Sequence, residues 1–286
     1  MASQATPQAS PPASPQAIAV LTRLLEARTG QQLASARAWR IDTALRPLMR
    51  LRALETLDQL VHLLLGGQEA ALSDQIVDAL VNNETSFFRE SPVFDSVVEA
   101  TTALEGEGRR ARVWCAGCST GQEPLSLAML FAERRDKTGR GMPEILGTDV
   151  SEGVIHRARQ GRYSQFEIQR GLPIRRAVTW FDGDASGEWI AKPELLRHVA
   201  YRPLNLMGEG WPIGRFDVIL CRNVLLYLSA EAKALMFTRF AEVLRPGGLL
   251  VLGAGETVIG QTDRFQPSAR VRGFYEPVVG GGRAVA

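Results

Sequence analysis

Apolar residues recur at two different spacings along the chain, and the change from one to the other divides it. From residue 18 to about residue 80 leucines stand three or four positions apart, most clearly between Leu45 and Leu64, which is the spacing of amphipathic helices. Further on, short apolar runs alternate with helical patterns. The sequence therefore predicts a small all-helical domain over residues 18–82 and a larger α/β domain over residues 83–286.

The larger domain alternates strands with helices, as a parallel sheet does. Buried strands are expected from Arg112 and at residues 144–149, 216–221 and 249–252.

An insert interrupts this alternation over about residues 172–203. Short strands are expected at residues 177–181, 188–191 and 199–201, with a hairpin loop at residues 182–187. The sequence thus predicts a small antiparallel β-subdomain at the edge of the main sheet.

The strand from Arg112 leads into a glycine turn and the start of a helix. Gly117 and Gly121 permit close backbone approach, and Pro124 suits the first turn of a helix. A P-loop would need Lys and then Ser or Thr after its last glycine, and a dinucleotide site would need G-x-G-x-x-G, but this turn has neither. Glu123 would repel a phosphate and suits a cation, such as the sulfonium of S-adenosylmethionine.

Polar residues or glycines follow four expected strands. Asp149 ends the strand at residues 144–149, where a carboxylate can accept hydrogen bonds from both hydroxyls of a ribose. Asp149 could instead cap the helix expected from Ser151 to Arg159, or it could do both. Because the carboxyl ends of parallel strands meet at one edge, Gly117, Asp149, Asn205 and Asn223 are expected together, as in a nucleoside cofactor site.

A polar and aromatic stretch precedes the sheet, from Asn82 to Pro92. It is too rich in hydrogen-bonding side chains for a simple linker. The alternative is structural, with Asn83 or Thr85 capping a helix that buries Phe87 and Phe88.

The composition fits a soluble protein with one large and one small domain, since 45% of its 286 residues are hydrophobic and 22% are charged. The net charge of +2 gives no reason to expect a nucleic-acid partner or a membrane surface. The N-terminus lacks the features of a signal peptide, and no apolar run reaches membrane-spanning length. We expect a cytoplasmic protein with a disordered tail over residues 1–17 and no membrane insertion.

The three cysteines include a C-x-x-C pair, Cys115 and Cys118. Only Cys221 could add a third thiolate, and the three histidines lack the spacing of metal ligands. We therefore expect small buried residues and no metal site.

The helical domain carries a set of arginines that only Asp42 opposes locally. They are Arg37, Arg40, Arg46, Arg50 and Arg52. They fit either a solvated helix face or a docking surface for an acidic protein.

Six segments resemble, in order and spacing, the CheR family of chemotaxis receptor methyltransferases. They are residues 83–89, 115–126, 161–163, 205–206, 221–224 and 244–248. The resemblance implies a class I S-adenosylmethionine-dependent methyltransferase fold, Rossmann-like, behind an all-α N-terminal domain and with a small antiparallel β-subdomain. It implies a monomer that methylates glutamate side chains on the cytoplasmic region of chemoreceptors, giving glutamate 5-O-methyl ester and S-adenosylhomocysteine.

The resemblance also implies a set of residues that contact the cofactor. They are Asn83, Thr85, Arg89, Glu123, Asp149, Asn205, Leu206, Asn223 and Val224. It matches the arginine-rich helix to the family's receptor-facing helix, which favours docking over a merely solvated face.

Two positions depart from the family pattern. Gln122 stands where the family commonly has Glu, and residues 91–93 lack a His that often follows its Phe-Phe-Arg. Neither change removes a cofactor contact. Some members grip a peptide from the receptor C-terminus with the β-subdomain and others do not, and the loop at residues 182–187 leaves both open.

The reaction would need placement rather than proton transfer. A glutamate with a pKa near 4.3 is already an anion at neutral pH, so no general base is required. In-line placement can contribute up to about 7–11 kcal/mol. The planar fork of Arg89 makes it the first candidate to orient the incoming carboxylate, and Tyr227 is a second candidate by position.

Two other functions stay open at this point. A class I methyltransferase of a small molecule would leave the motif at residues 83–89 and the basic helical domain unexplained. A catalytically silent adaptor that binds S-adenosylmethionine is disfavoured because every matched cofactor position is intact.

Overall fold

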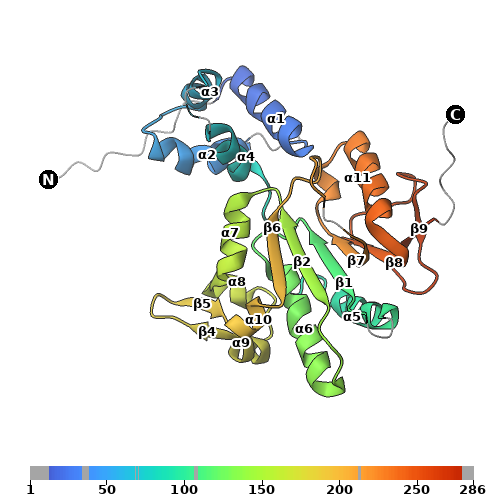
Figure 1. The fold of residues 1–286 in the computed structure, drawn as a ribbon. Coiled ribbons are helices and arrows are strands. Elements are labelled where there is room, and N and C mark those ends of the chain that lie inside the picture. The colour runs from blue at the N-terminus through green and yellow to red at the C-terminus, as the bar shows by residue number, and fades with distance from the viewer. Residues whose placement is uncertain are drawn as a thin grey trace. The chain divides into compact units, whose positions relative to one another are not determined.

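The computed structural model describes residues 13–33, 39–67, 69, 71–105, 109–211 and 214–278 (Figure 1). The chain divides into two compact units, residues 1–82 and residues 83–286. Among the described residues no helix combines the length and apolarity needed to cross a membrane. Residues 1–12 of the expected tail lie outside the described part, but α1 begins at Pro15, capped by the Ser14 hydroxyl. The tail therefore does not extend to residue 17 as predicted.

The described part of the first unit is helical. Its helices are α1 (Pro15–Thr29), α2 (Trp39–Leu51), α3 (Leu57–Leu65) and α4 (Leu72–Leu80). Each buries one face, because its apolar residues recur at helical spacing. Leu21, Leu45, Leu60 and Ile76, one from each helix, are fully buried.

The second unit is built on a seven-stranded sheet with the order β6-β2-β1-β7-β8-β10-β9. The parallel strands are β6 (Val199–Pro203), β2 (Glu144–Asp149), β1 (Arg112–Ala116), β7 (Phe216–Cys221) and β8 (Leu244–Leu252). The parallel sheet predicted from the sequence is therefore confirmed. The antiparallel strands β10 (Phe274–Pro277) and β9 (Phe265–Pro267), which complete the sheet, were not expected.

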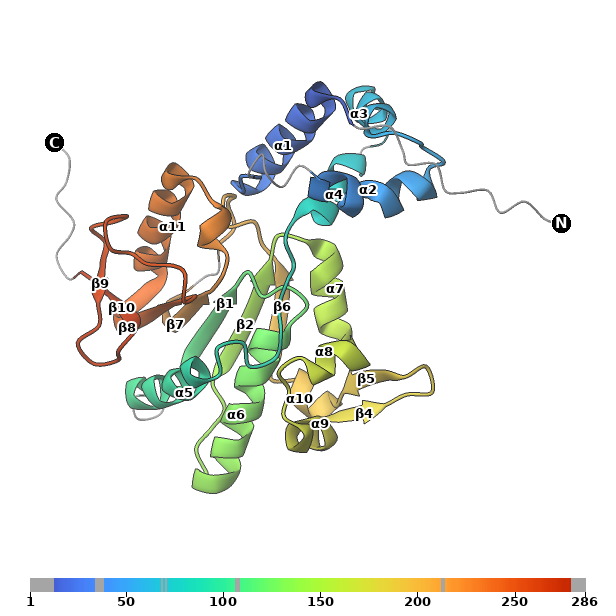
Figure 2. The same cartoon turned by 180° about the vertical axis from the view of Figure 1, so that it is seen from behind.

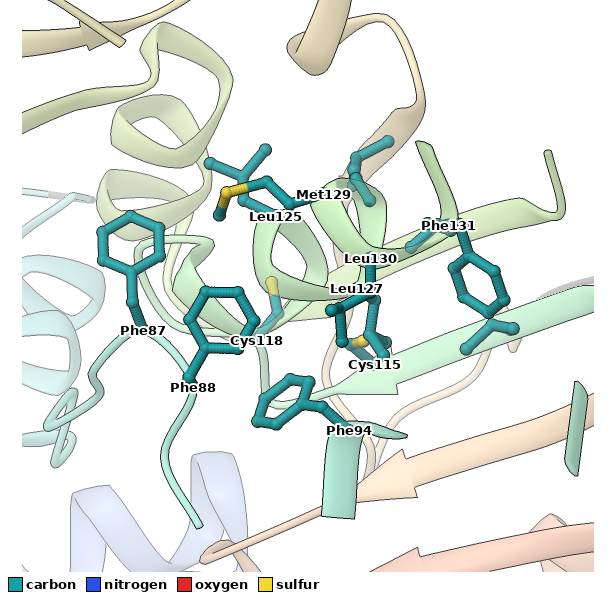
Figure 3. Packing of buried hydrophobic residues seen from close by; sticks show 14 of the residues in the cluster. Phe87, Phe88, Phe94, Cys115, Cys118, Leu125, Leu127, Met129, Leu130 and Phe131 are labelled. Carbon is teal, nitrogen blue, oxygen red and sulfur yellow. The ribbon is translucent and has the colours of Figure 1, made fainter. Parts of the chain in front are cut away.

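Both faces of this sheet are covered, and β1 shows how its sequence serves both. Val113 and Cys115 point into one apolar cluster, while Trp114 and Ala116 point into the other, since side chains alternate along a strand. The first cluster includes side chains of α5 (Pro92–Leu104), α6 (Gln122–Thr138) and α7 (Glu152–Gln160), and the second those of α11 (Ala230–Val243). These four helices are labelled in Figure 2. Figure 3 shows aromatic rings, Phe87 among them, beside side chains of α6.

The insert is an antiparallel sheet with the order β3-β5-β4. Its strands are β3 (Arg162–Ser164), β4 (Phe181–Gly183) and β5 (Glu188–Ala191), and its helices are α8 (Gln165–Gln169), α9 (Ile174–Trp180) and α10 (Pro193–Leu196).

Three expectations for the insert were wrong. Residues 177–180 are helical, because Pro173 starts a turn in which Ala177 is buried while Ile174 and Val178 face solvent, a helical rather than an alternating pattern. Residues 199–201 belong to β6 of the main sheet. The insert begins at β3, ahead of the predicted residue 172.

Candidate functional site

Four neighbouring parallel strands end at one edge of the main sheet. In the order β6, β2, β1 and β7 they lead into Asn205, Asp149, Gly117 and Asn223. We call this edge the carboxyl edge. The gathering of these four positions, predicted from the alternation of strands and helices, is confirmed.

The glycine turn after β1 is packed against side chains of the protein. Gly117 has φ +80°, and a Cβ added there would lie 2.5 Å from Cγ2 of Val224. Gly121 has φ +93°, and its Cβ would lie 2.8 Å from the Tyr201 hydroxyl. The backbone N–H of Gly117 donates to the Thr148 carbonyl over 2.8 Å. Glycine is required at both positions because the left-handed φ and the close neighbours each disfavour a side chain.

Asp149 is held by backbone donors on both sides. Its Oδ2 accepts a hydrogen bond from the Ser119 N–H over 2.9 Å, and Oδ1 accepts one from the Ser151 N–H over 3.2 Å. The N-cap of α7 is Ser151, whose hydroxyl accepts from the Val154 N–H. The helix cap that the sequence left open for Asp149 is therefore supplied by Ser151. A carboxylate can accept about four hydrogen bonds, and these two fix its orientation at the end of β2.

Residues 83–91 form a segment without helix, so neither Asn83 nor Thr85 caps one there as the structural alternative had it. We call it the Arg89 segment. The Ser119 hydroxyl donates to the Asn83 carbonyl over 2.8 Å. The Phe88 N–H donates to the Ser126 hydroxyl over 3.1 Å. These bonds attach the segment to the glycine turn and to α6.

Phe87 ties the same segment to the β-subdomain. Its buried ring meets Tyr163 and Phe181 edge-on, with centroid distances of 5.0 and 5.6 Å. A Cβ on Gly171, which has φ +101°, would lie only 2.1 Å from the Phe87 carbonyl oxygen. The Glu84 carboxylate pairs with Arg170 at the end of α8. The insert thus shapes the backbone that carries Arg89.

A pocket of about 380 Å³ lies beside this segment. It is lined by Asn83, Glu84, Thr85, Thr120, Gln122, Gly153, Val154, Arg157, Glu167 and Arg170. Two of the predicted cofactor residues, Asn83 and Thr85, line it. The guanidinium of Arg89, which is half-buried, donates to the Glu84 carbonyl over 3.3 Å.

Glu123 already has a cationic partner within the protein. Its Oε2 lies 2.8 Å from Nη1 of Arg222, and Nη2 of Arg222 lies 2.9 Å from Oε2 of Glu90. The same Nη2 donates to the Arg89 carbonyl over 2.7 Å. Sequence reasoning missed Arg222 as part of the site. The available signal was a charged residue directly after the fully apolar end of β7.

Glu256, after β8, was also missed. Its Oε2 accepts from the N–H groups of Asn223 and Gly253, each over 2.8 Å, and Oε1 accepts from the Leu226 N–H over 3.2 Å. It therefore holds the loop that carries Asn223 and Val224 and leads into the 3₁₀ turn η2 (Leu225–Tyr227), where Tyr227 is half-buried.

The loop after β6 carries the two remaining predicted contacts. Asn205 Oδ1 accepts from the Met207 N–H over 2.9 Å. The Leu206 carbonyl accepts from the Arg239 guanidinium over 3.0 Å.

Backbone strain gathers at the carboxyl edge. Among the described residues of the second unit, the non-glycine residues with positive φ are Phe88 (50°), Glu90 (60°), Ser119 (49°) and Asn223 (60°). Each such residue costs about 1–3 kcal/mol and persists only where its surroundings hold it. Strain of this kind is typical of ligand sites.

Three buried thiols lie near this edge. Cys115, Cys118 and Cys221 are free and buried. Burial raises the pKa of each thiol well above its usual value, and the charges of Glu123 near Cys115 and Asp149 near Cys118 raise it further. The described part of the chain contains no group of three or more His, Cys, Asp or Glu that could hold a metal ion.

A family model and several known proteins match this chain. The family model described as "CheR methyltransferase, SAM binding domain" matches residues 83–273. Chemotaxis protein methyltransferase 1 of Pseudomonas aeruginosa is 36% identical over 250 residues, which cover 85% of this chain and 90% of that protein. Chemotaxis protein methyltransferase Cher2 of Pseudomonas putida is 34% identical over 248 residues, covering 85% and 90%.

The chain is also similar to a more distant relative and to a solved methyltransferase structure. The chemotaxis protein methyltransferase of Escherichia coli is 32% identical over 225 residues, which cover 77% of each chain. The structure of magnesium protoporphyrin IX methyltransferase from Synechocystis PCC 6803 with bound SAH is 21% identical, covers 64% of this chain and 59% of that one, and has a TM-score of 0.33. The assignment therefore rests on the family model and the chemotaxis relatives: the chain belongs to the CheR methyltransferase family and is an S-adenosylmethionine-dependent methyltransferase with a class I fold.

Proposed function

We propose that this enzyme transfers the methyl group of S-adenosylmethionine to glutamate side chains on the cytoplasmic region of chemoreceptors, forming glutamate 5-O-methyl esters. The names of its relatives, chemotaxis protein methyltransferases, support this class of substrate. The observation that carries the proposal is the Arg89 segment, whose carbonyls at Asn83 and Arg89 are bound by Ser119 and Arg222 of the carboxyl edge. An arginine suited to an acidic acceptor is thereby fixed beside the edge where the donor would bind.

The donor would be held by the residues that the family resemblance names. They are Asn83, Thr85, Arg89, Glu123, Asp149, Asn205, Leu206, Asn223 and Val224. When bound, S-adenosylmethionine supplies a methyl group activated by a cationic sulfur. The polar chemistry of the edge fits this molecule, because Asp149 offers a fixed carboxylate for ribose hydroxyls. Arg222 with Glu90 and Glu123 leaves one net negative charge, which suits a cation.

The acceptor glutamate needs orientation only. With the donor bound, its carboxylate oxygen would take the methyl group and leave the electron pair of the carbon–sulfur bond on sulfur, so no proton would need to move. Arg89 would hold the other carboxylate oxygen with its planar fork. Tyr227, on the neighbouring η2 turn, is the second candidate for contact with the acceptor.

We propose that the helical unit supplies a basic surface for an acidic receptor segment. Arg37 lies outside the described residues. Arg46 pairs with Asp42 on the same helix, and Arg50 is exposed at the end of α2. Arg40 donates to the Asn82 side chain over 3.2 Å.

Arg52 suits docking least, because its side chain is only 15% exposed and already binds Glu69 over 2.8 Å. We propose that Arg40, Arg46 and Arg50 contact the receptor, together with the β-subdomain. The enzyme would act as a monomer in the cytoplasm, where these receptor regions lie.

The decisive experiment incubates the protein with labelled donor and receptor fragments and maps base-labile methyl esters. We expect label on glutamates of the receptor, and about a 100-fold loss of turnover in Arg89→Ala with an unchanged melting curve, since misplacement of the acceptor costs on that order. Binding of the donor without transfer would instead indicate a silent adaptor, and transfer only to small molecules would indicate the other rival. Wild-type turnover in Arg89→Ala would refute the role of Arg89.

A further inference from the structure

Arg222 joins three segments of the second unit through one buried guanidinium. It follows β7, and it reaches Glu123 in the first turn of α6 and both Arg89 and Glu90 in the Arg89 segment. We propose that Arg222 is a positioning residue for methyl transfer, which fixes the backbone of Arg89 relative to the carboxyl edge. This inference rests on the proposed role of Arg89.

The geometry rules out direct contact between Arg222 and an acceptor from another protein. Its side chain is 2% exposed, and its guanidinium carbon lies 5.4 Å from the centroid of the Phe94 ring. The two Nη atoms are used by the 2.8 and 2.9 Å contacts to Glu123 and Glu90 and by the 2.7 Å bond to the Arg89 carbonyl. Arg222 can therefore influence an acceptor only through the groups that it holds.

The backbone on either side of Arg89 is strained and needs stabilising contacts. Phe88 has φ 50° and Glu90 has φ 60°, conformations that persist only where the surroundings impose them. Arg222 binds the carbonyl between these two residues and the side chain of the second. Without it, this stretch could relax, and the guanidinium of Arg89 would move with it.

The burial of Arg222 is costly and incompletely compensated. Its Nε is buried without a hydrogen-bond partner among the described residues. Burying a charge with one donor unsatisfied is a poor way to gain stability. A role in fixing geometry accounts for keeping the arginine there.

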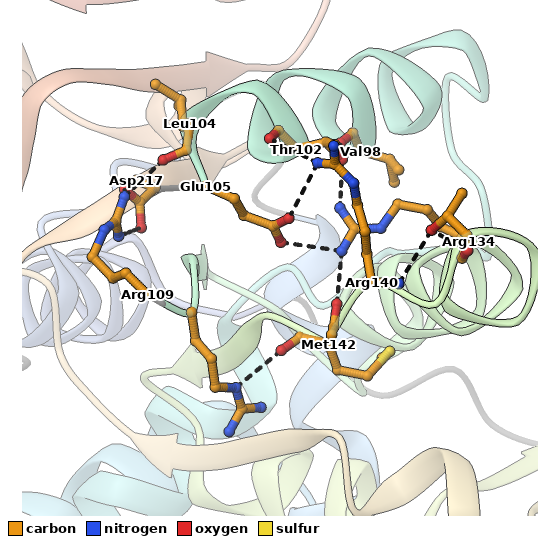
Figure 4. Close-up of polar contacts among 12 residues, drawn as sticks. Val98, Thr102, Leu104, Glu105, Arg109, Arg134, Arg140, Met142 and Asp217 are labelled. Carbon is orange, nitrogen blue, oxygen red and sulfur yellow. Dashed lines mark hydrogen bonds and ion pairs between the residues drawn. The ribbon is translucent and has the colours of Figure 1, made fainter. Parts of the chain in front are cut away.

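Arg109 is the matched control, because it makes similar bonds at the other end of β7. Its two Nη atoms donate to Asp217 over 2.8 and 2.9 Å, and Nη2 also donates to the Leu104 carbonyl over 2.7 Å (Figure 4). Like Arg222, Arg109 therefore donates two hydrogen bonds to carboxylates and one to a backbone carbonyl. It does so at the opposite end of β7 from the Arg89 segment.

The test is a double-mutant cycle with receptor fragment as acceptor. Arg222→Lys and Arg109→Lys are made alone and in the Arg89→Ala background, and kcat is measured with melting temperature. We expect Arg222→Lys to lower kcat about 100-fold and to have no further effect once Arg89 is alanine, because its influence passes through that side chain. Arg109→Lys should lower the melting temperature and leave kcat near that of its background in both cases.

The outcomes separate this inference from the proposed function. If the kcat of Arg89→Ala/Arg222→Lys is reduced by the product of the two single-variant losses, the positioning role of Arg222 is overturned and the role of Arg89 stands. Wild-type kcat in Arg222→Lys would have the same meaning. Wild-type kcat in Arg89→Ala would overturn both.

If Arg222→Lys does not fold, Glu90→Gln replaces it in the cycle. The Glu90 side chain is 29% exposed, and glutamine removes its charge while keeping an acceptor. The expected loss is then about tenfold, since one of three bonds is weakened rather than removed. It should again vanish in the Arg89→Ala background, and a loss that persists there would overturn the inference.

Discussion

The two ends of the main sheet use the same ionic chemistry for different purposes. At the amino ends, Arg109 binds Asp217, and Arg134 binds Glu105 over 3.1 Å (Figure 4). At the carboxyl ends, Arg222 binds Glu90 and Glu123. Within the second unit, the described non-glycine residues with positive φ all lie at the carboxyl ends. The amino-end pairs therefore join segments of ordinary conformation, whereas the carboxyl-end pairs also hold strained loops in place.

The largest effect should come from breaking the amino-end network at Asp217. Its side chain is 3% exposed and accepts hydrogen bonds from Arg109 and from the Arg112 N–H. Asp217→Ala removes the buried acceptor of the three hydrogen bonds from the partly exposed Arg109 side chain and the Arg112 N–H. Because hydrogen bonds to a charged group contribute about 1.5–3 kcal/mol and exposure weakens two of these, the free energy of unfolding should fall by about 3 kcal/mol. Urea unfolding measures this loss. The kcat of the folded fraction should stay at the wild-type value, and a collapse of kcat would remove the distinction between the two ends.

Asp149→Ala tests the carboxyl edge from the donor side. Loss of a charged acceptor for ribose hydroxyls should weaken binding of S-adenosylhomocysteine about 10- to 100-fold, since hydrogen bonds to charged groups contribute about 1.5–3 kcal/mol. Isothermal titration calorimetry measures the affinity. Asp149→Asn keeps one acceptor oxygen, so its affinity for S-adenosylhomocysteine should lie between those of the wild type and Asp149→Ala. Unchanged affinity in the alanine variant would reject Asp149 as a ribose acceptor.

Gly171→Ala tests whether the β-subdomain shapes the carboxyl edge. The new methyl group would meet the Phe87 carbonyl at 2.1 Å in a backbone with φ +101°. We expect a loss of about 1–3 kcal/mol in unfolding free energy together with a lower kcat, because the Arg89 segment must shift. Gly183→Ala in β4 is the control, since its Cβ would have no neighbour within 4 Å. Equal behaviour of the two variants in thermal melts and turnover would contradict the coupling.

The smallest effect concerns the thiols behind the carboxyl edge. Burial raises the pKa values of Cys115, Cys118 and Cys221, so at pH 8 each stays protonated, and the thiolate that attacks a disulfide reagent is scarce. Native protein should therefore show almost no thiol labelling at pH 8, and three thiols should react after unfolding in urea. Rapid labelling of the native protein would mean that the edge opens far more often than its packing suggests.

The sequence was sufficient for those parts of the fold that depend on local pattern. β1, β2, β7 and β8 were predicted because parallel strands covered on both faces are continuous apolar runs. β9 and β10 were missed because each is short and ends in proline, at Pro267 and Pro277, and a proline argues against a strand. α9 was misread because Val178 and Thr179 have strand propensity, whereas the helix start at Pro173 and the burial of Ala177 decided its structure.

The sequence predicted those positions of the candidate site that belong to local motifs. The strand ends with Asp149 and Asn223 lie where the sequence placed them. The pairing of Glu123 with Arg222 joins residues 99 positions apart, and no spacing rule connects them. Sequence reasoning therefore assigned Glu123 to an external cation and overlooked the internal one. Glu256 was missed for the same reason. Its carboxylate accepts hydrogen bonds from three backbone N–H groups that come together only in the folded chain.

The close approach of Gly171 to the Phe87 carbonyl restricts which β-subdomains could be exchanged between related enzymes. A chimaera that took its small sheet from another enzyme would inherit a foreign surface against Phe87, and would need glycine at that place and a ring of matching shape opposite it. The insert and the stretch before α5 are thus expected to be transplanted successfully only as a pair.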